Sequence, residues 1–162
     1  MRRLVCLGLL LAGFAVHAAP AGDPLKIGLS YPRTGNDKAE GLEQMRGALL
    51  AVAQVNAEGG VLGRPLQLET GNSASRAETA VNTVDRLQAK GVAMVFGGAT
   101  SEEVVAASRR AREHGLLYFA TLAYANEVTG QHGHRYLFRE SGSAHMSARV
   151  LGEYLAIHQP RR

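Results

Sequence analysis

The stretch Val92-Ala-Met-Val-Phe-Gly-Gly-Ala-Thr-Ser101 decides the fold, because it joins a strand to a helix through a glycine turn. Residues 92–96 form a continuous apolar run, which is typical of a strand covered on both faces of a sheet. Thr100 and Glu103 have the spacing of a capping box, in which each side chain accepts a hydrogen bond from the other residue's backbone amide. The stretch therefore predicts a strand, a loop of small residues and a helix that begins near Ser101.

Strand and helix patterns alternate on the N-terminal side of this stretch. Residues 25–31 and 66–70 indicate strands, and the second alternates apolar and polar residues as an edge strand does. Apolar residues at helical spacing follow the first strand; they are Leu42, Met45, Leu49 and Val52. A second helix is predicted after the other strand, beginning with a capping box made by Ser75 and Glu78.

The same alternation continues on the C-terminal side. The helix that begins near Ser101 ends at Gly115, and residues 116–120 form another continuous apolar strand. Residues 136–138 indicate a shorter strand. A last helix begins at about Ser143 and is predicted to bury the face that carries Ala148, Leu151 and Tyr154.

This alternation predicts an α/β fold, a Rossmann-like open parallel sheet with helices on both faces. Continuous apolar strands belong in the middle of such a sheet, which places residues 66–70 at an edge. The expected strand order is 2-1-3-4-5, and residues 19–162 are expected to form one domain.

The N-terminus has the layout of a secretory signal peptide. Arg2 and Arg3 precede an apolar run of 13 residues, and Val16 and Ala18 have the spacing of a cleavage site. The run is shorter than the roughly 20 residues that a membrane-spanning helix needs. Residues 1–18 are therefore predicted to be removed on export. The single cysteine lies within them, so the mature chain has no thiol chemistry.

Charge and composition exclude several classes of function. The formal charge is +4, or +2 without the two N-terminal arginines, and it lacks the dense basic stripe of a nucleic-acid-binding protein. His132 and His134 lie in a glycine-containing loop without the further ligands that zinc needs. The phosphate-binding glycine motifs and the G-x-S-x-G nucleophile motif are absent from the sequence. We expect no metal, no cofactor and no catalytic residues.

A binding site is expected where the strand order reverses, between the first and third strands. The loops there are residues 32–35, which include Thr34, and residues 97–101, with residues 121–124 beside them. The glycine pair lets a ligand approach the backbone, and the helix after it directs free amides toward an anionic group. In the alternative reading, Thr100 only caps the helix and the glycines only turn the chain.

The segment Asn56-Ala-Glu-Gly-Gly-Val-Leu-Gly-Arg-Pro-Leu-Gln-Leu68 resembles the helix-turn-strand signature of type I periplasmic binding proteins. More narrowly, it resembles the leucine/isoleucine/valine-binding family of ABC-transporter receptors. Residues 25–35, 95–101 and 127–129 resemble corresponding motifs of that family. The resemblance covers nearly all of residues 19–162.

The resemblance implies a set of ligand-binding residues. Ser101 matches a serine that hydrogen-bonds the ligand's carboxylate, and Leu122 and Tyr124 match positions that contact the amino-acid backbone. At the position of Tyr124 the family usually has a small residue. At the position of Glu40 it often has an aromatic residue that stacks on the ligand. The candidate site consists of Ser101, Leu122 and Tyr124, with Thr34 and Thr100 from the loops. The ligand could be a branched-chain or other amino acid, an amide or a small organic acid.

The function expected from the resemblance is that of a periplasmic substrate-binding component of an ABC transporter. Such a protein binds a small polar ligand and delivers it to a membrane permease, without catalysis. A ligand-sensing module of a signalling system and an exported α/β enzyme remain alternatives. Family members have two lobes, so residues 19–162 are expected to be the N-terminal lobe of a truncated or partial sequence, with the second lobe absent.

Overall fold

The protein is described here by a computed structural model, which covers residues 21–159. One sheet of five parallel strands forms its centre, in the order β2-β1-β3-β4-β5. The strands are β1 (Leu25–Tyr31), β2 (Leu66–Asn72), β3 (Met94–Gly97), β4 (Leu117–Ala120) and β5 (Leu137–Arg139). The predicted fold class and strand order are confirmed. The predicted signal peptide lies outside the described residues.

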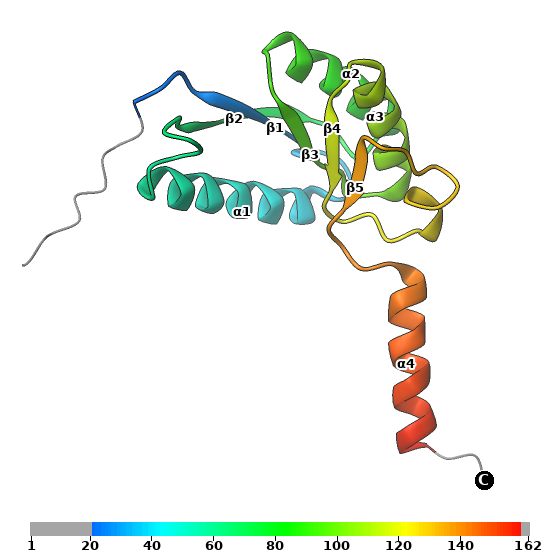
Figure 1. Ribbon diagram of the computed structural model, residues 1–162. Coiled ribbons are helices and arrows are strands. Elements are labelled where there is room, and N and C mark those ends of the chain that lie inside the picture. The colour runs from blue at the N-terminus through cyan, green and yellow to red at the C-terminus, as the bar shows by residue number, and fades with distance from the viewer. Residues whose placement is uncertain (1–20, 160–162) are drawn as a thin grey trace, which may run out of the picture.

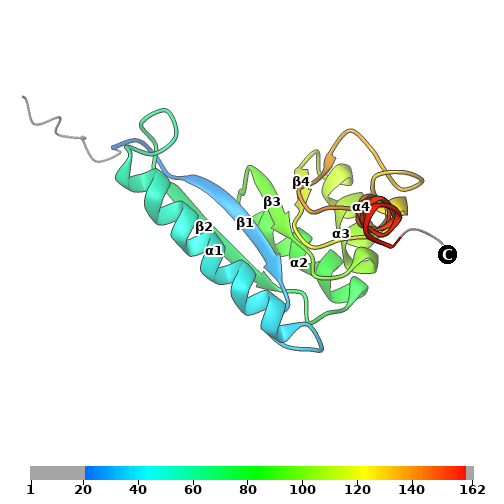
Figure 2. The same cartoon turned by 90° about the horizontal axis from the view of Figure 1, so that it is seen from below.

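Helices cover both faces of the sheet unequally. The helices are α1 (Lys38–Ala57), α2 (Ala77–Ala89), α3 (Ser101–Glu113) and α4 (Ala144–His158), with a short 3-10 helix η1 (Asn126–Val128). Figure 1 and Figure 2 show α2 and α3 side by side on one face and α1 alone on the other. Within residues 21–159, no helix is both long enough and apolar enough to cross a membrane.

The main core lies between the sheet and the pair α2 and α3. It consists of side chains from both helices, from β3, β4 and β5 and from the loops beside them; among the fully enclosed ones are Val84, Leu87, Val95, Val104 and Tyr118. Burial of these apolar side chains supplies most of the driving force for folding. This core holds the carboxyl ends of the strands, and the loops beyond them, in place.

The helix α1 packs less tightly than its sequence pattern suggests. Gly41 is its single buried residue, and Leu42 and Leu49 are 48% and 51% exposed. An apolar pocket of about 420 Å³ is lined by residues of α1 and of β1, β2 and β3. The periodicity placed apolar residues on one side of the helix, but it did not determine how closely that side approaches the sheet.

The prediction for the last helix is wrong in one respect. The helix exists, but none of its residues is buried, and Leu151 and Tyr154 of the predicted buried face are 57% and 56% exposed. Figure 1 shows α4 leading away from the sheet. Helical spacing groups apolar residues on one face, but it does not specify what that face packs against.

One further expectation, on the start of α2, is corrected. The helix begins at Ala77 with Arg76 as its N-cap, so Ser75 makes no capping box. The Ser75 hydroxyl instead accepts a hydrogen bond from the backbone N–H of Asp37, 3.0 Å away. Asp85, also on α2, accepts hydrogen bonds from Arg110 and His114 and joins α2 to α3. The hydrogen bond from the Arg110 guanidinium has the largest effect on the pKa of Asp85 and lowers it below its usual range. The hydrogen bond from the His114 ring lowers it further.

Candidate functional site

The start of α3 is fixed by the predicted capping box. The Thr100 hydroxyl accepts a hydrogen bond from the Glu103 N–H at 3.2 Å. The Glu103 carboxylate accepts from the N–H groups of Thr100 and Ala99, at 3.0 and 3.1 Å. The Glu103 residue is 1% exposed, so these bonds form away from water. Thr100 therefore has the capping role that the sequence left as one of two alternatives.

Ser101 is the first residue of α3 and joins that helix to the loop after β4. Its Oγ accepts a hydrogen bond from the backbone N–H of Ala125 at 3.1 Å. The hydroxyl hydrogen is not used in this bond and remains able to donate. Ser101 lines a cavity of about 390 Å³, together with Glu102, Arg109 and other residues of α3 and the η1 region. A polar donor thus stands at the positive end of a helix, beside a cavity.

The loop after β4, which carries Leu122 and Tyr124, lies beside Ser101 in the folded chain. Leu122 is half-buried, whereas Tyr124 is 53% exposed and offers its ring to solvent. The Tyr124 carbonyl accepts a hydrogen bond from the N–H of Ala144 at 2.9 Å, which ties the loop to the start of α4. Because Ser101 bonds to Ala125, the next residue, the structure brings Ser101 and this loop together.

Thr34 has a different setting. Its hydroxyl accepts a hydrogen bond from the Asn72 side-chain amide at 2.9 Å, at the end of β2. Asn72 belongs to the edge strand, so Thr34 helps to close the corner between β1 and β2 rather than to complete the cavity beside Ser101.

The two glycines at the end of β3, Gly97 and Gly98, are required by close packing. Gly97 has φ +134°, and a Cβ there would lie 1.9 Å from the carbonyl oxygen of Ser30. Gly98 has φ +85°, and a Cβ there would lie 2.3 Å from the Val104 side chain. The loop therefore lies directly against β1 and α3, and this contact alone explains the glycine pair.

Sequence reasoning missed Gln44 of α1, whose side-chain amide donates to the Gly98 carbonyl at 3.4 Å. Its Oε1 is buried and, within the described part of the chain, lacks a hydrogen-bond partner. The signal was present, because Gln44 is a polar residue next to the apolar positions of a helix. Only the packing of α1 against the sheet shows that it reaches the glycine loop.

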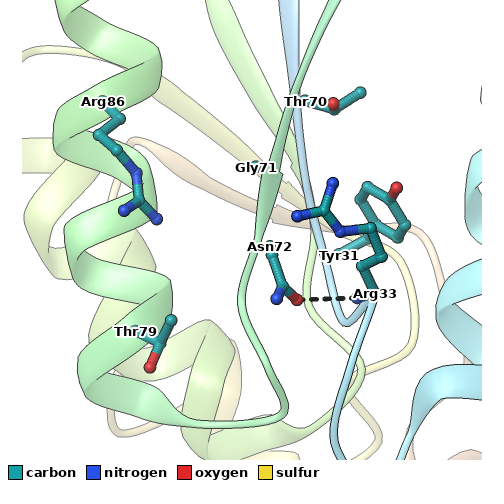
Figure 3. Close-up of a pocket in the computed structure, with 7 residues that line it drawn as sticks. All are labelled: Tyr31, Arg33, Thr70, Gly71, Asn72, Thr79 and Arg86. Carbon is teal, nitrogen blue, oxygen red and sulfur yellow. Dashed lines mark hydrogen bonds between the residues drawn. The ribbon is translucent and has the colours of Figure 1, made fainter.

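A third cavity, of about 410 Å³, lies at the carboxyl ends of β1 and β2 (Figure 3). Its lining residues come from β1, the loop after it, β2 and α2; they are Tyr31, Arg33, Thr70, Gly71, Asn72, Thr79 and Arg86. The sequence analysis named Arg33 only as part of a loop and did not consider Arg86. More than 50 residues separate the two arginines, and only the pairing of β1 with β2 and the packing of α2 bring them together.

The two histidines of the predicted surface loop have separate environments. His132 Nδ1 lies 3.0 Å from the Arg109 guanidinium at the rim of the Ser101 cavity. His134 is half-buried, and its burial, with the nearby charges of Arg112 and Arg109, lowers its pKa. Among residues 21–159, no three His, Cys, Asp or Glu side chains are grouped as a metal site requires.

Comparison with known proteins agrees with this architecture. A family model described as periplasmic binding protein matches residues 24–162. Leu/Ile/Val-binding protein homolog 8 from Brucella suis is 37% identical over 143 residues, which cover 88% of this chain and 35% of that protein. The leucine-, isoleucine-, valine-, threonine-, and alanine-binding protein from Pseudomonas aeruginosa is 33% identical, over 90% of this chain and 39% of its own length.

Solved structures show the same fold. The branched-chain amino acid transporter substrate binding protein LivJ from Streptococcus pneumoniae, in complex with isoleucine, is 27% identical with a TM-score of 0.74. The match covers 83% of this chain and 38% of that one. The chain therefore belongs to the periplasmic binding protein family, a family of substrate-binding proteins, which confirms the resemblance seen in the sequence. It spans between a third and two fifths of the length of the curated relatives described above.

Proposed function

We propose that this chain is part of the substrate-binding component of an ABC transporter and binds an amino acid or a related small polar solute. Its membership of the periplasmic binding protein family supports this proposal, as do relatives whose names specify leucine, isoleucine and valine. The bound solute would pass to a membrane permease. Its working compartment would be the periplasm, where the family's name places such proteins.

The observation that carries the proposal is the setting of Ser101. The serine opens α3, so its hydroxyl and the first free amides of the helix lie at the positive end of the helix dipole. The bond from Ala125 orients the hydroxyl and leaves its hydrogen free. A ligand carboxylate is the group that such an arrangement stabilises.

The ligand class is proposed more broadly than the branched-chain amino acids. Tyr124 places a large exposed ring in the loop next to Ser101, and Glu40 places an exposed carboxylate near the start of α1. Both could contact a polar group that leucine or isoleucine lacks. Amides, polar amino acids and small organic acids therefore belong in a ligand screen beside the aliphatic amino acids.

We also propose that residues 19–162 are one lobe of a two-lobed binding protein. The relatives are more than twice as long as this chain, and the apolar side of α4 is exposed. In such proteins, closure of two domains around a hinge encloses the ligand. One lobe alone would hold its ligand weakly, since water competes for each exposed hydrogen bond.

Replacement of Ser101 with alanine tests the site. Loss of one hydrogen bond to a charged group costs about 1.5–3 kcal/mol, so affinity for the carboxylate-bearing ligand should fall roughly tenfold to 150-fold. The ligand is found by titrating the purified chain with amino acids, amides and organic acids, using NMR to detect affinities as weak as ~1 mM.

Ser147→Ala is the matched control, because Ser147 is an exposed residue of α4, outside the Ser101 cavity. It should bind like the parent chain. An unchanged affinity in Ser101→Ala, or binding of none of these ligands, would contradict the proposal.

Removal of residues 1–18 on export is a separate prediction. The cationic start, the short apolar run and the Val16 and Ala18 spacing are those of a cleaved leader. Protein produced in an exporting bacterium should be released by osmotic shock and have an intact mass that begins at Ala19. A released product that still contains Met1 would show that the prediction is wrong. Ala18→Leu should slow the cleavage, since that site requires a small residue.

A further inference from the structure

The cavity of about 410 Å³ at the ends of β1 and β2 has an unusual balance of charge. Arg33 enters it from the loop after β1, and Arg86 enters it from α2. Figure 3 shows the two side chains on either side of the end of β2. None of the residues that line the cavity is acidic, so two positive charges share it without a lining carboxylate.

The side chains of Arg33 and Arg86 have few hydrogen-bond or ion-pair partners within the described residues. Arg86 donates one hydrogen bond, to the Thr83 hydroxyl at 2.8 Å. Within residues 21–159, no carboxylate lies within 4.0 Å of the Arg33 or Arg86 guanidinium, whereas four other arginines have such partners; they are Arg46, Arg76, Arg110 and Arg149. The two guanidinium groups therefore keep most of their donors available.

Both arginines are tied to one residue, Asn72. Its side-chain oxygen accepts a hydrogen bond from the backbone N–H of Arg33 at 2.9 Å. Its backbone carbonyl accepts one from the Thr83 hydroxyl at 2.9 Å, and Thr83 in turn accepts from Arg86. A short chain of hydrogen bonds thus holds Asn72, which forms the base of the cavity, and the side chain of Arg86, which lies at its wall.

Gly71 determines how closely α2 approaches this base. A Cβ at Gly71 would lie 2.2 Å from the Thr83 side chain, so the glycine allows the helix to come down onto the edge strand. That close approach brings Arg86 over the end of β2. The position of Arg86 at this cavity is therefore set by close packing of α2 on the β2 backbone, and not by surface side chains alone.

We propose that this cavity binds a divalent oxyanion, such as inorganic phosphate or a dicarboxylate. The planar fork of a guanidinium group matches two oxygens of a carboxylate or phosphate, and two such forks match a group with two negative charges. A bound anion would also offset the repulsion between the two like charges. The site is separate from the Ser101 cavity, with which it shares no lining residue, and does not depend on the function proposed above.

The test titrates the purified chain at low ionic strength with inorganic phosphate, succinate and acetate. Calorimetry measures the affinity, and NMR follows the Gly71 amide and the arginine side-chain N–H signals. We expect saturable binding of phosphate or succinate, with the tighter of the two identifying the oxyanion. Acetate, with a single charge, should bind about tenfold more weakly or worse.

Variants assign the binding to the two arginines. Arg33→Gln and Arg86→Gln should each weaken the binding about tenfold or more, because each removes a charged pair of donors. Arg86→Lys keeps the charge without the fork and should restore part of the affinity. Arg46→Gln is the matched control, since Arg46 is an exposed arginine of α1 that pairs with Glu43.

Four results would overturn the proposal. They are an absence of saturable binding by either divalent anion, binding by Arg33→Gln and Arg86→Gln that equals the parent's, equal losses in Arg46→Gln, and anion-induced shifts confined to other amides. In these cases the two arginines would serve only to keep the free edge of the sheet charged and unpaired with other chains.

Discussion

Replacing Gly97 with alanine is expected to destabilise the domain by about 4 kcal/mol or more, or to prevent folding. The added Cβ would lie 1.9 Å from the Ser30 carbonyl oxygen, and the residue has φ +134°, which an L side chain rarely adopts. Ser30 and Gly97 face each other in the pairing of β1 with β3, so neither strand can move without breaking the sheet. Urea denaturation followed by circular dichroism measures the change.

Gly47→Ala is the matched control for this prediction. Gly47 lies within α1, and apart from its own chain neighbours and the adjacent helix backbone nothing lies within 4 Å of the position its Cβ would take. Alanine there should stabilise the protein by about 0.5–1 kcal/mol, since glycine is a poor helix former. If Gly97→Ala unfolded at the same urea concentration as the parent chain, the close contact between β1 and the loop after β3 would be refuted.

Leu87→Ala is expected to cost about 2–5 kcal/mol of stability. Leu87 belongs to α2, is 1% exposed and packs in the core between that helix and the sheet. The substitution removes buried apolar surface and leaves a cavity that the surrounding side chains fill only in part. The loss should appear as a lower urea midpoint with an unchanged slope.

Leu62→Ala provides the same chemical change at the surface. Leu62 is 97% exposed in the turn before β2, so its replacement should change stability by no more than about 0.5 kcal/mol. Equal effects of the two substitutions would show that the core does not lie on the α2 side of the sheet.

The order of the strands and the start of α3 could be predicted because each depends on local pattern. Continuous apolar runs distinguish central strands from the alternating edge strand; this difference placed residues 66–70 at an edge, consistent with the observed order. The Thr100 and Glu103 pair formed its capping box because both partners lie within one turn of chain. The same spacing failed at Ser75, because its hydroxyl binds the Asp37 amide in another loop.

The candidate site was predictable only in part. Ser101 follows from its place after a strand and at the start of a helix, and its bond to Ala125 agrees with the expected position of the loop after β4. Thr34 was grouped with Ser101 because they follow the first and third strands, between which the strand order reverses. The Thr34 hydroxyl, however, bonds to Asn72 at the edge of the sheet. Sequence position locates a loop, but the direction of a side chain within it depends on partners from other segments.

By itself, then, the sequence determined the type, order and polarity of the elements, because hydrophobic periodicity and capping act over a few residues. Tertiary structure alone decided which faces those elements bury. The exposed side of α4 shows this, as does the cavity that Arg33 and Arg86 line together at the end of β2. Both features depend on distances between segments far apart in the chain, which strand register and helix packing set and which no local pattern records.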